Sequence, residues 1–215
     1  MPLPMVHLGI AVQLGDVKGE TLSSAFLLGS IAPDAIHMRP NADRVAKQMT
    51  HLRMAESDLP ERLQAFLEER SSLPENEQSF AAGYVAHILT DALWVTEVVQ
   101  PFHSQIPATM TKEERRTLYY QETDQVDFNL YHGAPWRETI WHQLKQASAP
   151  DLPPLLTAQE ITLWQDRTLR WFAELKEEPG IQPMYLTDAL VHGFIDRATA
   201  HVAAALDDWC SSNYL

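Results

Sequence analysis

The chain has 215 residues, of which 45% are hydrophobic and 21% are charged, an ordinary composition for a globular protein with one full core. Its 16 basic and 29 acidic residues give a formal net charge of −13. Such a charge disfavours binding to nucleic acid phosphates and to anionic membranes. We therefore expect a single domain over residues 1–215 that neither binds nucleic acid nor inserts stably in a membrane.

Three features of the sequence predict a cytoplasmic location. The N-terminal segment has no basic residue before its apolar run and no clear small-residue cleavage site, so we expect no signal peptide. No run of about twenty apolar residues is present that could span a bilayer. The single cysteine, Cys210, excludes a disulfide within the chain and fits a reducing compartment.

Helical periodicity recurs along the chain, whereas clean alternating runs and Asn-Gly or Asp-Gly hairpin turns are lacking. The predicted helical segments are, in chain order, 3–14, 21–34, 42–55, 59–70, 74–100, 111–131, 135–147, 157–177 and 183–210. Pro33 is expected to close the second segment, and the fifth is expected to stop before Pro101. The pattern predicts an all-α fold, a multi-helix bundle in which the residues beyond a proline-rich connection at 148–156 pack on the same bundle.

Four apolar stretches each carry side chains that can bind a metal ion: His7, Asp34, His51, and His87 with Asp91. His87 and Asp91 are four apart on one helix, so they point the same way and can share a ligand. An unpaired carboxylate in an apolar core is very costly, and a divalent cation removes that cost. Neutral imidazole and carboxylate suit zinc, and suit iron or manganese less selectively.

Each of these residues also has an ordinary structural interpretation. A single histidine on an apolar face is usually a core residue with a backbone partner, and His51 can lie on a surface. Asp34 follows a proline and can cap the next helix or form an Asx-turn. A second His-x-x-x-Asp pair, His192 and Asp196, has charged neighbours, so we interpret it as a local polar network. Because all four stretches are apolar, the joint occurrence favours a metal site.

The first hundred residues resemble the zinc-dependent phospholipase C family, in its bacterial branch. The matching positions are His7, residues 26–35, Lys47, Thr50, His51, Phe80, Gly83, Tyr84, His87, Thr90, Asp91 and Trp94. This resemblance implies an all-helical fold similar to phospholipases C and single-strand nucleases, with clustered zinc ions that support phosphodiester cleavage.

Roles follow from the resemblance residue by residue. Asp34, His51, His87 and Asp91 resemble the ligands of one zinc ion, and Asp91 resembles a carboxylate that bridges towards a second ion. His7 resembles a ligand of that second ion, and Asp34 also resembles the general base proposed in the family.

The chain departs from the secreted members after Asp91, where it lacks their histidine-rich stretch. Asp124 and Asp127 are three apart on a predicted helix and can complete a second site with His7. A solvated acidic face is the alternative for this pair. We therefore expect one or two Zn²⁺ ions, with iron or manganese left open.

The sequence thus predicts a metal-dependent, phospholipase C-like hydrolase of phosphoester bonds that acts on a small soluble substrate. The alternative is a catalytically inactive metal-binding or structural protein on the same fold. A di-iron or manganese oxidoreductase is disfavoured, because the chain has no Glu-x-x-His pair. A homodimer and the role of residues 150–215 are left open.

Overall fold

The computed structural model describes residues 3–53, 58–175 and 177–212, and within these ranges the chain is helical without a β-strand. The α-helices are α1 (Pro4–Lys18), α2 (Ser24–Gly29), α3 (Arg44–Thr50), α4 (Leu59–Glu68), α5 (Glu75–Trp94), α6 (Gln100–Gln105), α7 (Lys112–Gly133), α8 (Arg137–Gln146), α9 (Ala158–Glu174) and α10 (Asp188–Ser212). A 3-10 helix, η1 (Ala32–Met38), and a π-helical turn, η2 (Val95–Val99), complete the described elements. The all-α prediction is confirmed.

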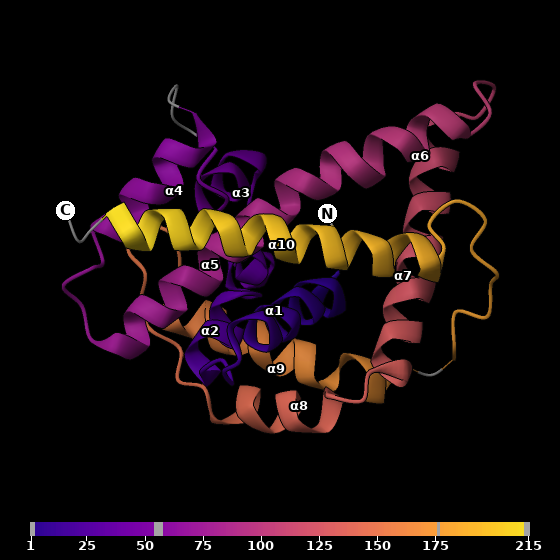
Figure 1. The fold of residues 1–215 in the computed structure, drawn as a ribbon. Coiled ribbons are helices and arrows are strands. Elements are labelled where there is room, and N and C mark those ends of the chain that lie inside the picture. The colour runs from indigo at the N-terminus through magenta and orange to yellow at the C-terminus, as the bar shows by residue number, and fades with distance from the viewer. Residues whose placement is uncertain (1–2, 54–57, 176, 213–215) are drawn as a thin grey trace.

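The helices form one packed assembly in which the first helix, α1, lies against the last, α10 (Figure 1). Helix α10 runs along α1 and crosses α5, and α9 packs against η1. The helices that follow the proline-rich connection therefore cover helices that precede it. Among the described residues, we find no helix that combines the length and the apolar character needed to cross a membrane.

Local signals in the sequence explain where several helices begin. The Thr111 side chain accepts from the backbone N–H of Glu114, whose carboxylate accepts from the backbone of Thr111 in return. Thr157 and Glu160 repeat this capping box at the start of α9. Each box pairs two backbone donors that the first helical turn leaves without partners.

Two prolines behave differently from the prediction. Pro33 lies in the first turn of η1, and Pro101 lies in the first turn of α6, so neither ends a helical segment. The prediction that the fifth segment stops before Pro101 is wrong. The wider turn η2, in which the backbone N–H of Gln100 donates to the carbonyl oxygen of Val95, carries the chain from α5 directly into α6. In a regular α-helix the proline ring would clash with the carbonyl group four residues earlier, and the π-helical turn changes the hydrogen-bond register just before Pro101.

Helices α2 and α5 approach unusually closely because a glycine lies at the contact on each side. A Cβ atom on Gly29 would lie 2.1 Å from the carbonyl oxygen of Phe80, and one on Gly83 would lie 2.1 Å from the carbonyl oxygen of Phe26. Any side chain would therefore separate the two backbones. This contact brings the end of α2 beside the middle of α5, where His87 is located.

We expect Gly83→Ala to lower the free energy of unfolding by about 3 kcal/mol or more, because overfilling a packed contact against backbone atoms forces the helices apart. Urea denaturation followed by circular dichroism measures the change. Gly133→Ala is the matched control, since nothing lies within 4 Å of its added methyl group. Equal stability of both variants would contradict the close α2–α5 contact.

Candidate metal centre

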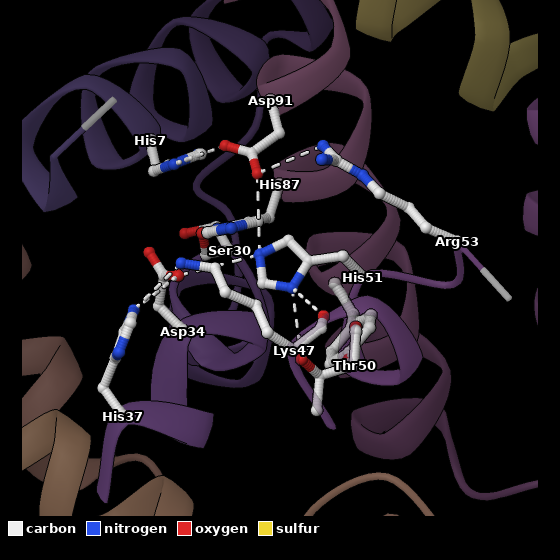
Figure 2. Close-up of polar contacts among 11 residues, drawn as sticks. His7, Ser30, Asp34, His37, Lys47, Thr50, His51, Arg53, His87 and Asp91 are labelled. Atoms are coloured by element: carbon white, nitrogen blue, oxygen red, sulfur yellow. Dashed lines mark hydrogen bonds and ion pairs between the residues drawn. The ribbon is translucent and has the colours of Figure 1, made fainter. Parts of the chain in front are cut away.

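Four helical elements bring together five of the residues predicted to bind metal (Figure 2). His7 comes from α1, Asp34 from η1, His51 follows α3, and His87 and Asp91 come from successive turns of α5. All five side chains are buried, and Asp91 is completely inaccessible. Residues separated by more than eighty positions in the chain thus share one polar site inside an apolar core.

The distances within this cluster are typical of metal ligands rather than of hydrogen-bonded partners. His51 Nε2 lies 3.6 Å from Asp34 Oδ1 and 3.5 Å from Asp91 Oδ2. His7 Nε2 lies 3.8 Å from Asp91 Oδ1. Such separations are too long for strong hydrogen bonds. They approach the roughly 3.4 Å expected between two ligands of a tetrahedral zinc ion with bonds of about 2.1 Å.

Two overlapping groups of three residues could hold a cation: His7 with Asp34 and His87, and His51 with His87 and Asp91. Within each group, one donor atom per residue lies within 4.8 Å of the others. The two oxygens of Asp91 face different histidines, His7 and His51. This carboxylate is therefore oriented so that each oxygen could bind a metal ion at a different one of two neighbouring sites.

Buried polar atoms that lack a hydrogen-bond partner concentrate in the same cluster. Of the eleven such side-chain atoms among the described residues, seven belong to these five residues: both ring nitrogens of His7, Oδ1 of Asp34, Nε2 of His51 and of His87, and both oxygens of Asp91. A buried polar atom without a partner costs about 1–3 kcal/mol, and more when it is charged. Bound divalent cations would satisfy these atoms together, so the donor set fits the metal that the sequence predicts.

Backbone carbonyl groups orient two of the imidazole rings. His87 Nδ1 lies 2.8 Å from the carbonyl oxygen of Ser30, and His51 Nδ1 lies 2.9 Å from the carbonyl oxygen of Lys47. A carbonyl only accepts, so each Nδ1 carries the proton and donates. Each Nε2 is then left with a lone pair directed into the cluster, as a metal ligand requires. The close α2–α5 contact is what places Ser30 beside His87.

Two of the buried histidines, His7 and His87, favour their neutral form. Burial lowers the pKa of His7 well below its ordinary value, and the nearby His87 lowers it further. Burial also lowers the pKa of His87, although Asp91 and Asp34 oppose this change. Burial alone would raise the pKa of Asp34, but its interactions with His51, His87 and His7 keep that pKa below its usual range. The site thus combines neutral imidazoles with an ionised carboxylate.

Three residues outside the predicted set border the cluster (Figure 2). His37 Nε2 lies 3.6 Å from Asp34 Oδ1, and Lys47 Nζ lies 3.2 Å from the same nitrogen of His37. Arg53 Nη2 lies 3.6 Å from Asp91 Oδ2, and 40% of its side chain is exposed. Sequence reasoning did not assign these residues a role, although His37 lies one helical turn after Asp34. Burial lowers the pKa of His37, so Lys47 and Arg53 are the residues that give the cluster a positively charged side.

The structure does not bring Asp124 and Asp127 to this cluster. Asp127 is buried, and its Oδ1 accepts the backbone N–H of Met5 at 3.1 Å, in the first turn of α1. It therefore provides α1 with a long-range cap, which that helix lacks from its own N-cap residue Leu3. Asp124 is exposed to solvent, as the solvated-face alternative expects. We omit both residues from the proposed ligand set.

Burial raises the pKa of Asp127 well above its ordinary value. A raised pKa means that the folded state binds the proton more tightly, so this contribution to stability is present in acid and is lost as the pH rises through the folded-state pKa. We expect Asp127→Asn to be more stable than the unaltered protein at pH 7, by about 1–3 kcal/mol, because the amide oxygen retains the cap without a buried charge. The difference should shrink towards pH 4.

Urea denaturation at several pH values measures this difference. Asp166→Asn, on the exposed surface of α9, is the control and should leave the pH profile unchanged. A loss of stability in Asp127→Asn at pH 7 would show that the carboxylate charge is needed at the start of α1.

The second His-x-x-x-Asp pair lies apart from the cluster. Asp196 is exposed and accepts from the side-chain amide of Gln13 at 2.9 Å, while His192 is exposed on the same helix. Arg197 pairs with Glu97 at 2.9 Å and not with its neighbour Asp196. Both residues lie on the surface, and neither belongs to a potential cation-binding group within the described ranges.

The fold and the cluster define an all-helical protein with a buried histidine and aspartate centre suited to metal ions. The family model of zinc-dependent phospholipase C matches residues 6–153, which is more than half of the chain. The chain belongs to the zinc-dependent phospholipase C family. This confirms the resemblance noted in the first hundred residues and extends it to α8. No curated protein and no solved structure was found to be significantly similar.

Proposed function

We propose that the protein is a metal-dependent hydrolase of phosphoester bonds that acts on a small soluble substrate, with one or two zinc ions held by His7, Asp34, His51, His87 and Asp91. The observation that carries this proposal is that one cluster contains seven buried nitrogen and oxygen atoms that could bind a metal ion and that lack a hydrogen-bond partner. Membership of the phospholipase C family supports hydrolysis. A cytoplasmic location and no nucleic acid substrate, both predicted from the sequence, belong to the same proposal.

The histidines supply ligand nitrogens of fixed orientation. Because Ser30 and Lys47 accept from Nδ1 of His87 and His51, the rings keep one tautomer and one orientation. When bound, a divalent metal ion lowers the pKa of a coordinated water and polarises phosphoryl oxygens.

Asp34 is the carboxylate best placed to accept a proton from an attacking water. The side chain of Asp34 is 8% exposed to solvent, whereas that of Asp91 is fully buried. The depressed pKa of Asp34 keeps it ionised at neutral pH. His37, 3.6 Å from Asp34 and 45% exposed, lies between this carboxylate and solvent and can pass the proton onward.

Arg53 and Lys47 are suited to bind the substrate phosphate. Each carries a positive charge at the border of the cluster, and Arg53 already faces an oxygen of Asp91. Their charges offset the acidic surface of the chain and complement the phosphoryl oxygens. The anionic group of the substrate would therefore approach from this side.

The alternative is an inactive metal-binding protein. Its motivation is that the histidines after Asp91 do not extend the centre: His103 and His132 are exposed, on α6 and α7. A phosphoester screen with bis(p-nitrophenyl) phosphate and p-nitrophenyl phosphate distinguishes the two functions. Zinc-dependent turnover that the unaltered protein shows and His87→Ala lacks supports the hydrolase. Metal binding without turnover on either class of ester favours the alternative.

A further inference from the structure

A groove of 590 Å³ lies between η2, α6 and the first half of α7, away from the residues of the metal cluster. In Figure 1 these helices meet at the upper right of the molecule. Val99 and His103 line one side, and residues of α7 line the other. The groove is large enough for a small molecule.

The α7 side of this groove is a stripe of cationic and aromatic residues. Lys112, Arg115, Arg116, Tyr119 and Tyr120 follow one another at helical spacing and all line the groove. Among the described residues, no acidic side chain contributes to the lining. The chain has a net charge of −13, but the three cations on this helical face make the wall of the groove positively charged.

These cations are available to a ligand. Within the described part of the chain, no carboxylate forms an ion pair with Lys112 or Arg116. The nearby Glu114 is occupied in the capping box with Thr111. Arg115 is held in place, because it donates to the carbonyl oxygens of Met110 at 2.9 Å and Ala108 at 3.0 Å. An anion would therefore meet one fixed and two unpaired cations.

The two tyrosines give the groove an apolar surface beside the charges. Tyr120 is 48% exposed, and its ring lies under the guanidinium of Arg116 at 5.7 Å. Tyr119 is fixed from behind, because the indole N–H of Trp94 donates to its hydroxyl at 2.7 Å. Met110 and Val99 add apolar contacts. The lining thus matches a molecule with an anionic end and a flat or apolar part.

We propose that this groove binds a small phosphomonoester, with the phosphate on Lys112, Arg115 and Arg116 and its apolar part against Tyr119 and Tyr120. The site is independent of the metal centre and requires no metal ion.

Isothermal titration with phenyl phosphate at low ionic strength tests the proposal. Four proteins are compared: the unaltered protein, K112Q/R116Q, the control K145Q/R170Q with the same change in charge, and H87A. We expect K112Q/R116Q to weaken groove binding at least about tenfold, because two charge-assisted contacts are lost. The control and H87A should retain that binding. Phenyl phosphate should also bind more tightly than inorganic phosphate.

Other results would overturn the proposal. Binding that H87A abolishes and K112Q/R116Q preserves would assign the phosphate to the metal centre alone. Equal affinity for phenyl phosphate and inorganic phosphate would remove the role of the tyrosines. Sedimentation with phosphatidylglycerol vesicles that depends on Lys112 and Arg116, without binding of phenyl phosphate, would identify the stripe as a membrane-docking surface instead.

Discussion

His87→Ala is expected to reduce the metal content of the protein to less than about a tenth of its unaltered value, since even loss of an outer partner of a ligand costs 10–100-fold in affinity. His87 belongs to both groups of three potential ligands, so its removal leaves neither group complete. Elemental mass spectrometry measures zinc, iron and manganese per chain. The protein must be purified without a metal-binding affinity tag. About one or two ions per unaltered chain are expected.

The same variant should show how much of the stability of the folded protein comes from bound metal and how much comes from packing. A ligand that binds only the folded state stabilises it, by about 2.7 kcal/mol at a free concentration of one hundred times its Kd. We therefore expect EDTA to lower the Tm of the unaltered protein and to leave that of His87→Ala unchanged. Thermal unfolding with and without EDTA checks this.

His192→Ala is the matched control, because His192 has the same spacing to an aspartate but lies exposed on α10. It should keep the full metal content and the full response to EDTA. Full occupancy in His87→Ala would contradict the ligand assignment. Absence of metal from the unaltered protein, even after reconstitution, would mean that the cluster is a polar network without a cation.

Asp34→Asn is expected to lower phosphoester turnover about 10²–10⁴-fold while the protein retains metal, because the amide cannot accept the proton of the attacking water. The asparagine keeps the size of the side chain and one donor oxygen. Initial rates on bis(p-nitrophenyl) phosphate, normalised to metal content of the same sample, measure the effect.

Asp124→Asn serves as the control, since Asp124 is exposed and lies outside the cluster. Its turnover and metal content should equal those of the unaltered protein. An unchanged rate in Asp34→Asn would remove the general-base role. Loss of both metal and turnover would define Asp34 as a ligand whose charge the site requires.

Much of this molecule can be read from local patterns. Helical periodicity predicted the all-α class and a helical segment that begins at residue 111, where the structure has the capping box of α7. The spacing of His87 and Asp91 predicted that both side chains lie on one face of a helix. Each of these features depends on residues within one or two helical turns of each other, so it can be predicted from a short stretch of sequence.

Long-range packing established the rest. Asp127 does not join the metal cluster, because its carboxylate accepts the backbone N–H of Met5 in α1, 122 positions away in the chain. Arg53 and His37 border the cluster only because η1 and the residues after α3 are brought to α5. Two glycines at the contact between α2 and α5 bring the backbone that leads into η1 close to α5. Helical spacing sets which side chains share a face, but the faces that meet are chosen by the packing of the whole core, which no single segment encodes.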